Sequence, residues 1–169
     1  MKGSEPSSSR PDLALRIESN GARPEVVDSL LRELPEWFGI DEAIEEYVTR
    51  SAQLPTYTAI LDGEPVGVLV LEHHSDRVAE LYVLATARRL HRRGIGRALV
   101  DAAERDLARA GTTYVQVKTL GASHDSPEYA ATRRFYEALG YQGLEEYPAD
   151  TLWPGNPCLV MVKHLGCSA

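Results

Sequence analysis

Apolar residues recur along this chain with two periods, and each period predicts one kind of element. A period of two marks residues 12–19 as a strand with one buried face. Residues 56–61 and 64–71 are also typical of strands. The Asp62-Gly63 dipeptide between them favours a tight hairpin turn, because both residue types tolerate positive φ angles. Further apolar strands are predicted over residues 77–84, 114–119 and 158–163.

A spacing of three and four residues between apolar positions predicts helices. The expected ranges are 24–34, 41–48, 94–110 and 128–139. Pro35 interrupts the first helix, and the Asp41 side chain can cap the second. Gly111 and Gly140 mark the ends of the third and fourth. Helices and strands alternate without a repeat or a long linker, which predicts one α/β domain.

Composition limits the class of protein. The chain has 169 residues, a formal net charge of −7 and 43% hydrophobic residues, which are ordinary values for a globular domain. Residues 1–11 are nearly devoid of apolar side chains, so we expect a disordered tail followed by a single domain over residues 12–169. The sequence contains no secretory signal and no membrane-spanning run, which favours a cytoplasmic protein that does not bind a membrane.

Cysteine spacing and charge narrow the expected ligands. Cys158 and Cys167 form no CxxC or Cys/His cluster, so neither a disulfide framework nor a metal site is indicated. The acidic balance argues against nucleic-acid binding, which requires cations to neutralise phosphates. It mildly favours attraction of small cationic molecules.

The most informative segment joins the strand that ends at Leu84 to a glycine-rich turn, His91-Arg92-Arg93-Gly94-Ile95-Gly96-Arg97-Ala98, that opens a helix. Such a turn directs unpaired backbone N–H groups and the positive end of the helix dipole at one place, which suits a phosphate. The Walker pattern is absent, and Leu99 occupies the third glycine position of the dinucleotide fingerprint.

Residues 91–96 resemble the [Q/R]xxGx[G/A] motif of the GNAT superfamily of acetyl-CoA-dependent N-acetyltransferases. The run Phe135-Tyr136-Glu137-Ala138-Leu139-Gly140-Tyr141 resembles that family's FYEKLGF signature. The chain departs from the family pattern at His91, Tyr129 and Thr132, where Gln or Arg, Asn and Ala are common. The resemblance covers residues 13–165 and implies a mixed, mostly antiparallel sheet with flanking helices. It also implies acetyl-CoA as acyl donor and, in many members, a homodimer.

The resemblance also suggests which residues hold acetyl-CoA. Main-chain amides of the glycine-rich turn would hold the pyrophosphate, and a backbone N–H near Val83 or Leu84 would polarise the thioester carbonyl. The splayed strand edge would pair with the pantetheine arm like an added strand. The full set of expected donor-binding residues is Tyr82, Val83, Leu84, His91, Arg92, Arg93, Gly94, Ile95, Gly96, Arg97, Ala98 and Arg133.

Two residues are candidates for proton transfer. Glu80 lies in an apolar strand, so its carboxylate is either partly buried with a raised pKa or turned to solvent; the resemblance favours a general base acting through water. Tyr136 is a candidate general acid, because a phenol is protonated at neutral pH and can meet a forming thiolate. A purely structural aromatic is the alternative for Tyr136.

The acceptor side is predicted less directly. The corner containing Glu36, Trp37 and Phe38, together with the acidic helix after it, could attract an ammonium, although such charges also suit a solvated helix face. His124 and Trp153 are further candidates. The prediction is therefore an N-acetyltransferase for a small cationic primary amine, such as a polyamine or an aminoglycoside. The alternatives are a protein lysine or N-terminal acetyltransferase, an acetyl-CoA-binding sensor and an unrelated nucleotide-phosphate binder.

Overall fold

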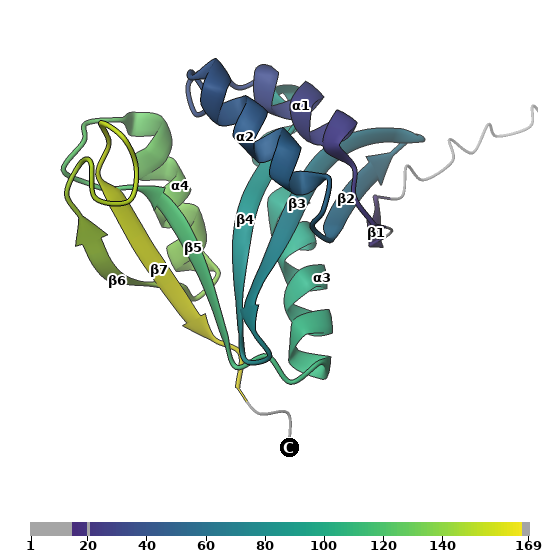
Figure 1. The fold of residues 1–169 in the computed structure, drawn as a ribbon. Coiled ribbons are helices and arrows are strands. Elements are labelled where there is room, and N and C mark those ends of the chain that lie inside the picture. Colours follow the sequence, from purple (N-terminus) through teal and green to yellow (C-terminus); the bar gives the residue numbers. More distant parts are fainter. Residues whose placement is uncertain (1–14, 20, 167–169) are drawn as a thin grey trace, which may run out of the picture.

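A single seven-stranded sheet organises the chain in the computed structural model, which describes residues 15–19 and 21–166 (Figure 1). The tail expected at residues 1–11 lies outside the described residues. The strands are β1 (Arg16–Ser19), β2 (Thr56–Leu61), β3 (Glu64–Ser75), β4 (Val78–Thr86), β5 (Tyr114–Leu120), β6 (Gln142–Tyr147) and β7 (Cys158–His164). The helices are α1 (Pro24–Arg32), α2 (Asp41–Ser51), α3 (Ile95–Arg109) and α4 (Pro127–Ala138), with a short 3₁₀ helix at Arg88–Leu90.

The sheet is mixed and mostly antiparallel, as the family resemblance implied. Its order is β1-β2-β3-β4-β5-β7-β6, and β4 and β5 form the parallel pair. Asp62 and Gly63 form the expected turn between β2 and β3, with φ angles of 55° and 82°. Positive φ at both residues matches the twist of the flanking strands, so the local dipeptide was sufficient to predict the hairpin.

The helices cover both faces of the sheet. Helices α1 and α2 pack on one face, and α3 packs on the other against β2, β3 and β4, while α4 lies against β5 (Figure 1). Gly67 on β3 allows α3 to approach closely, because a Cβ there would lie 2.9 Å from Ile95 Cγ2 and 3.0 Å from Leu99 Cδ1. Val27, Leu31 and Leu99 are fully buried in the resulting core.

One expectation about an individual element was wrong, and one strand was missed. Asp41 does not cap α2; Ile40 occupies the cap position, and Asp41 instead begins the helix and pairs with Arg32 at 3.2 Å. The edge strand β6 was not predicted, because Gln142–Tyr147 is almost entirely exposed and lacks alternating apolar residues. Pairing with β7, a non-local contact, is what makes this segment a strand.

Candidate active site

The centre of the sheet opens where β4 and β5 separate. The two strands pair from Val78 to Leu81 on β4, and the ladder stops at Leu81 opposite Val117. Beyond this point β4 and β5 diverge (Figure 1). On the other edge of β4, the register with β3 shifts at the same point, so that Tyr82 is an extra residue between Leu81 and Val83. This bulge bends β4 away from β5. Within the described chain, the β5-facing backbone groups of β4 beyond Leu81 therefore have no strand partner.

The glycine-rich turn lies next to this opening, at the start of α3. Gly94 is the cap residue with φ 79° and ψ 3°, and no side chain of the described residues caps the helix. The first intrahelical hydrogen bond runs from Ala98 N to Gly94 O at 2.9 Å, so the preceding amides of the first turn have no helical acceptor. Gly96 brings the helix against α4, because a Cβ there would lie 3.2 Å from Phe135 Cζ. This end of α3 is suited to hold an anion.

A cavity of about 790 Å³ connects the strand opening with the glycine-rich turn. It brings together most of the residues predicted for donor binding and several of those predicted for the acceptor. The predicted residues that line it are Trp37, Phe38, Tyr82, Val83, Leu84, His91, Arg92, Gly94, Ile95, Gly96, Arg97, Tyr136 and Trp153.

Other predicted site residues lie outside the lining. Arg133 donates to the Leu120 carbonyl at 2.8 Å, and the neighbouring Arg134 faces the cavity instead. Glu36 is ion-paired with Arg88. Arg93, Ala98, His124 and Glu80 are also absent from the described residues that line the cavity.

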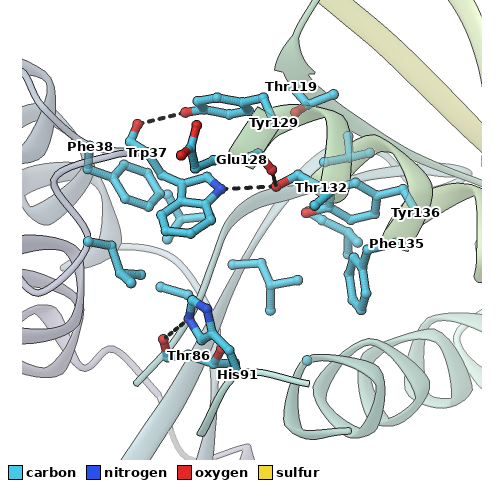
Figure 2. A pocket seen from close by; sticks show the side chains of 18 of the residues that line it. Trp37, Phe38, Thr86, His91, Thr119, Glu128, Tyr129, Thr132, Phe135 and Tyr136 are labelled. Carbon is cyan, nitrogen blue, oxygen red and sulfur yellow. Dashed lines mark hydrogen bonds between the residues drawn. The ribbon is translucent and has the colours of Figure 1, made fainter. Parts of the chain in front are cut away.

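Trp37 joins three parts of the cavity wall (Figure 2). Its indole N–H donates to Thr132 Oγ1 at 3.1 Å, and its carbonyl accepts from Tyr129 Oη at 2.6 Å, which ties the α1–α2 corner to α4. Its ring also meets His91 edge to face with centroids 5.5 Å apart. His91 Nε2 in turn lies 3.0 Å from the Thr86 carbonyl at the end of β4. These contacts enclose the cavity between β4 and α4.

Glu80 is buried on the face of the sheet that α1 and α2 cover. Its carboxylate accepts from Lys118 Nζ at 2.9 and 3.1 Å and from Gln116 Nε2 at 2.7 Å, and it lies 2.7 Å from His74 Nε2. Burial raises the pKa of Glu80, but the hydrogen bonds from Lys118, Gln116 and His74 outweigh it and leave the pKa below its usual value. Glu80 is therefore neither turned to solvent nor a carboxyl of raised pKa. It is a buried, ionised carboxylate, and its partner Lys118 lines the cavity.

Tyr136 lies on α4 and faces the cavity beside Phe135 (Figure 2). Its side chain is 5% exposed, and burial, followed by the nearby Tyr129, raises its pKa above the usual value for a phenol. Its hydroxyl donates no hydrogen bond to any residue that the structure describes. The hydroxyl is thus protonated at neutral pH and available to a ligand.

Sequence reasoning missed several residues of the lining. The most informative are Tyr47 on α2, Lys118 on β5, and Glu128 and Arg134 on α4. Only position in the helical or strand repeat could have indicated these residues, since none belongs to a recognisable motif. Tyr129 and Thr132 were noted as departures from the family pattern, and both turn out to hold Trp37.

The chain belongs to the acetyltransferase (GNAT) family, whose model matches residues 23–141. The match includes β4, the glycine-rich turn and the whole of α4. It confirms the family and the fold class that the two motifs predicted.

The individual relatives are 18–28% identical to this chain over the residues that align. An uncharacterized N-acetyltransferase from Chlorobaculum tepidum is 28% identical over 112 residues, which is 66% of this chain and 64% of that relative. A crystal structure of a GNAT-family acetyltransferase from Desulfovibrio desulfuricans superposes with a TM-score of 0.74 at 18% identity, covering 90% of this chain and 100% of the other. An aminoglycoside 6′-N-acetyltransferase complexed with coenzyme A gives a TM-score of 0.67 at 20% identity, covering 89% and 97%. These likenesses establish the fold and leave the acceptor open.

Proposed function

We propose that this protein transfers the acetyl group of acetyl-CoA to the primary amine of a small acceptor. The observation that carries the proposal is the continuous cavity that joins an uncapped helix N-terminus to the unpaired edge of β4. Coenzyme A consists of an extended pantetheine arm joined to a pyrophosphate. The pyrophosphate can bind the amide donors of the helix, and the arm can pair with the strand edge.

The chain's own residues suit the acetyl-CoA substrate. Arg92, Arg97 and Arg134 line the cavity, and they would add cations to the amide donors that the first turn of α3 directs at the phosphates. The unpaired edge of β4 near Val83 would hold the pantetheine amides and supply one N–H to the thioester carbonyl. Coenzyme A bound to a structural neighbour supports this choice of donor.

The proposed chemistry is direct attack of an unprotonated amine on the thioester. A C–N bond forms, the C–S bond breaks, the thiolate takes up one proton and the amine nitrogen loses another to a base. We assign the first proton to Tyr136, whose hydroxyl faces the cavity. We assign the second to Glu80 acting through a water, because its carboxylate stands behind Lys118 rather than on the cavity wall.

Thiol release in the presence of acetyl-CoA and a panel of amines tests the function. The expected result is amine-dependent thiol release together with an N-acetylated product identified by mass spectrometry. Binding of coenzyme A without turnover of any amine would instead favour an acetyl-CoA sensor. Thermal protection by ATP or NAD but not by coenzyme A would favour a nucleotide-phosphate binder, and both results contradict the proposal.

Replacing Gly94 with alanine should weaken binding of coenzyme A by about tenfold, equivalent to ~1.4 kcal/mol. Gly94 has φ 79°, and the side of its Cα that a Cβ would occupy is open space beside the amides of α3. The added methyl strains the turn and crowds an approaching phosphate. Titration calorimetry measures the change.

Gly63→Ala is the matched control for this substitution. Gly63 also has a positive φ, 82°, and a Cβ there would meet nothing within 4 Å, but it lies in the β2–β3 hairpin. Both variants should lose about 1–2 kcal/mol of folding stability from the strained backbone. Equal coenzyme A affinities in the two variants would contradict a phosphate site at Gly94.

Location and further partners are proposed from the sequence. No helix in the described part of the chain is long and apolar enough to cross a membrane. The cytoplasmic location, the homodimer and the absence of a nucleic-acid partner stay predictions.

A further inference from the structure

The acidic residues that were expected to recruit a cationic acceptor do not face the cavity. Asp41 pairs with Arg32, and Glu36 pairs with Arg88. The other acids of α2 are exposed, and Tyr47 is the one residue of that fully described helix that lines the cavity. The charge run on α2 is therefore a solvated helix face.

Glu128 supplies the sole carboxylate among the described residues that line the cavity. Its half-buried side chain lies between the Trp37 indole and the Tyr129 phenol, at the first turn of α4 (Figure 2). It accepts a hydrogen bond from Ser126 Oγ at 3.2 Å and is paired with no cation among the residues that the structure describes. The carboxylate can therefore pair with a cationic ligand without breaking an ion pair within the described part of the chain.

The other charged residues of the lining are cations. Lys118 lines the cavity, but its charge is already balanced by Glu80. Arg92, Arg97 and Arg134 lie at the glycine-rich turn and on α4, where the phosphates are proposed to bind. The acceptor side of the cavity thus offers one negative charge.

Aromatic side chains form the rest of this wall. Burial raises the pKa of Tyr47 to about 12, and it raises the pKa of Tyr82 and Tyr129 as well. These phenols therefore stay neutral and add no anion at physiological pH. The aromatic residues of the lining on this side are Trp37, Phe38, Tyr47, Tyr82, Tyr129 and Trp153.

We propose that the acceptor is a small monoamine with an aromatic or apolar body rather than a polycation. This inference rests on the proposed function and names the class of its acceptor. A single ammonium can pair with Glu128 as it enters, and a flat apolar body can pack on the aromatic wall. A second or third ammonium would be buried without a counter-charge and close to Lys118, which is strongly unfavourable.

Acetylation of four amines, measured as kcat/KM at one acetyl-CoA concentration, tests the acceptor class. The probes are 2-phenylethylamine, spermidine, kanamycin and a peptide that carries one lysine and a blocked N-terminus. We expect 2-phenylethylamine to exceed each of the others by about tenfold or more. A higher value for spermidine, kanamycin or the peptide overturns the monoamine proposal and leaves the acetyltransferase function standing. No acetylation of any probe despite binding of coenzyme A overturns the function itself.

Two isosteric substitutions locate the counter-charge. Glu128→Gln should raise the KM for 2-phenylethylamine by about tenfold, with the KM for acetyl-CoA and the unfolding midpoint nearly unchanged. Glu45→Gln, on the exposed face of α2, should leave all three values as they are. The proposal is wrong if Glu45→Gln raises the amine KM, or if Glu128→Gln leaves it unaltered.

Discussion

Replacing Glu80 with glutamine should lower kcat by about 10²-fold or more, the usual effect of losing a positioned proton acceptor. Glutamine fills the same space and can still accept a hydrogen bond from Lys118, but it cannot take up a proton. The affinity for coenzyme A should change little, because Glu80 lies outside the cavity lining. Single-turnover kinetics and calorimetry measure the two quantities separately.

Glu72→Gln is the matched control for this substitution. Glu72 is the cross-strand neighbour of Glu80 on β3, and it is also paired with a cation, Arg50. Removing the charge of Glu72 should alter kcat by no more than about twofold, since partly exposed ion pairs contribute little to the stability of a fold. If Glu80→Gln retains the wild-type kcat, Glu80 has no part in the reaction.

The lowered pKa of Glu80 also sets a direction for stability against pH. A carboxyl whose pKa is lower in the folded state stabilises the fold above the unfolded value of about 4.3. This contribution is lost as the pH falls through the lower folded pKa. Urea unfolding between pH 7 and pH 3 should therefore show a steeper acid loss in the wild type than in Glu80→Gln. If both proteins lose stability equally as the pH falls, the contacts with Lys118, Gln116 and His74 do not stabilise the ionised carboxylate of Glu80.

Local chemistry determined the parts of the fold that the sequence predicted well. The Asp62-Gly63 turn and the helix-ending Gly111 and Gly140 all depend on positive φ angles that few residue types adopt, so the residue type indicates the conformation. The helices were predicted to within a few residues because their buried faces repeat regularly. Such features need no knowledge of the rest of the chain.

Contacts between distant segments explain what the sequence did not reveal about the site. Trp37 was assigned to the acceptor because it stands in an acidic corner, yet its partners Tyr129 and Thr132 lie 92 and 95 positions away. Glu128 sits one helical turn before Thr132 and carries no motif. Its proposed role as a counter-charge depends on the packing of α4 near the α1–α2 corner, which places Glu128 in the wall of the cavity.

Contacts between distant segments also determine the environment of Glu80. Its strand context offered burial with a raised pKa or exposure, and the actual state is burial with a lowered pKa. The difference comes from β5, which places Gln116 directly opposite Glu80 and Lys118 two residues further on the same face. Strand order and register decide that outcome, and neither can be read from the residues around Glu80.

Replacing Tyr136 with phenylalanine should reduce kcat by about 10²-fold, a typical loss for a general acid. The ring and its packing against Phe135 and Tyr141 remain, with centroids 5.1 and 5.6 Å away in the wild type. The hydroxyl makes no hydrogen bond to a described residue, so the free energy of unfolding should barely change. Because burial keeps the pKa of Tyr136 above its usual value, its ionisation should not limit the rate below about pH 10.

Tyr141→Phe is the control for this substitution, and we expect it to lower stability while leaving kcat unchanged. The Tyr141 hydroxyl donates to Glu104 Oε1 at 2.8 Å outside the cavity lining, and Glu104 also accepts from Lys163 at 2.5 Å. Removing this buried donor should cost about 1–3 kcal/mol of stability and leave kcat intact. Comparing the two variants therefore distinguishes a hydroxyl that acts in catalysis from one that only stabilises the fold. If Tyr136→Phe behaves as Tyr141→Phe is expected to, losing stability and keeping its rate, Tyr136 is a core aromatic and another group must protonate the thiolate.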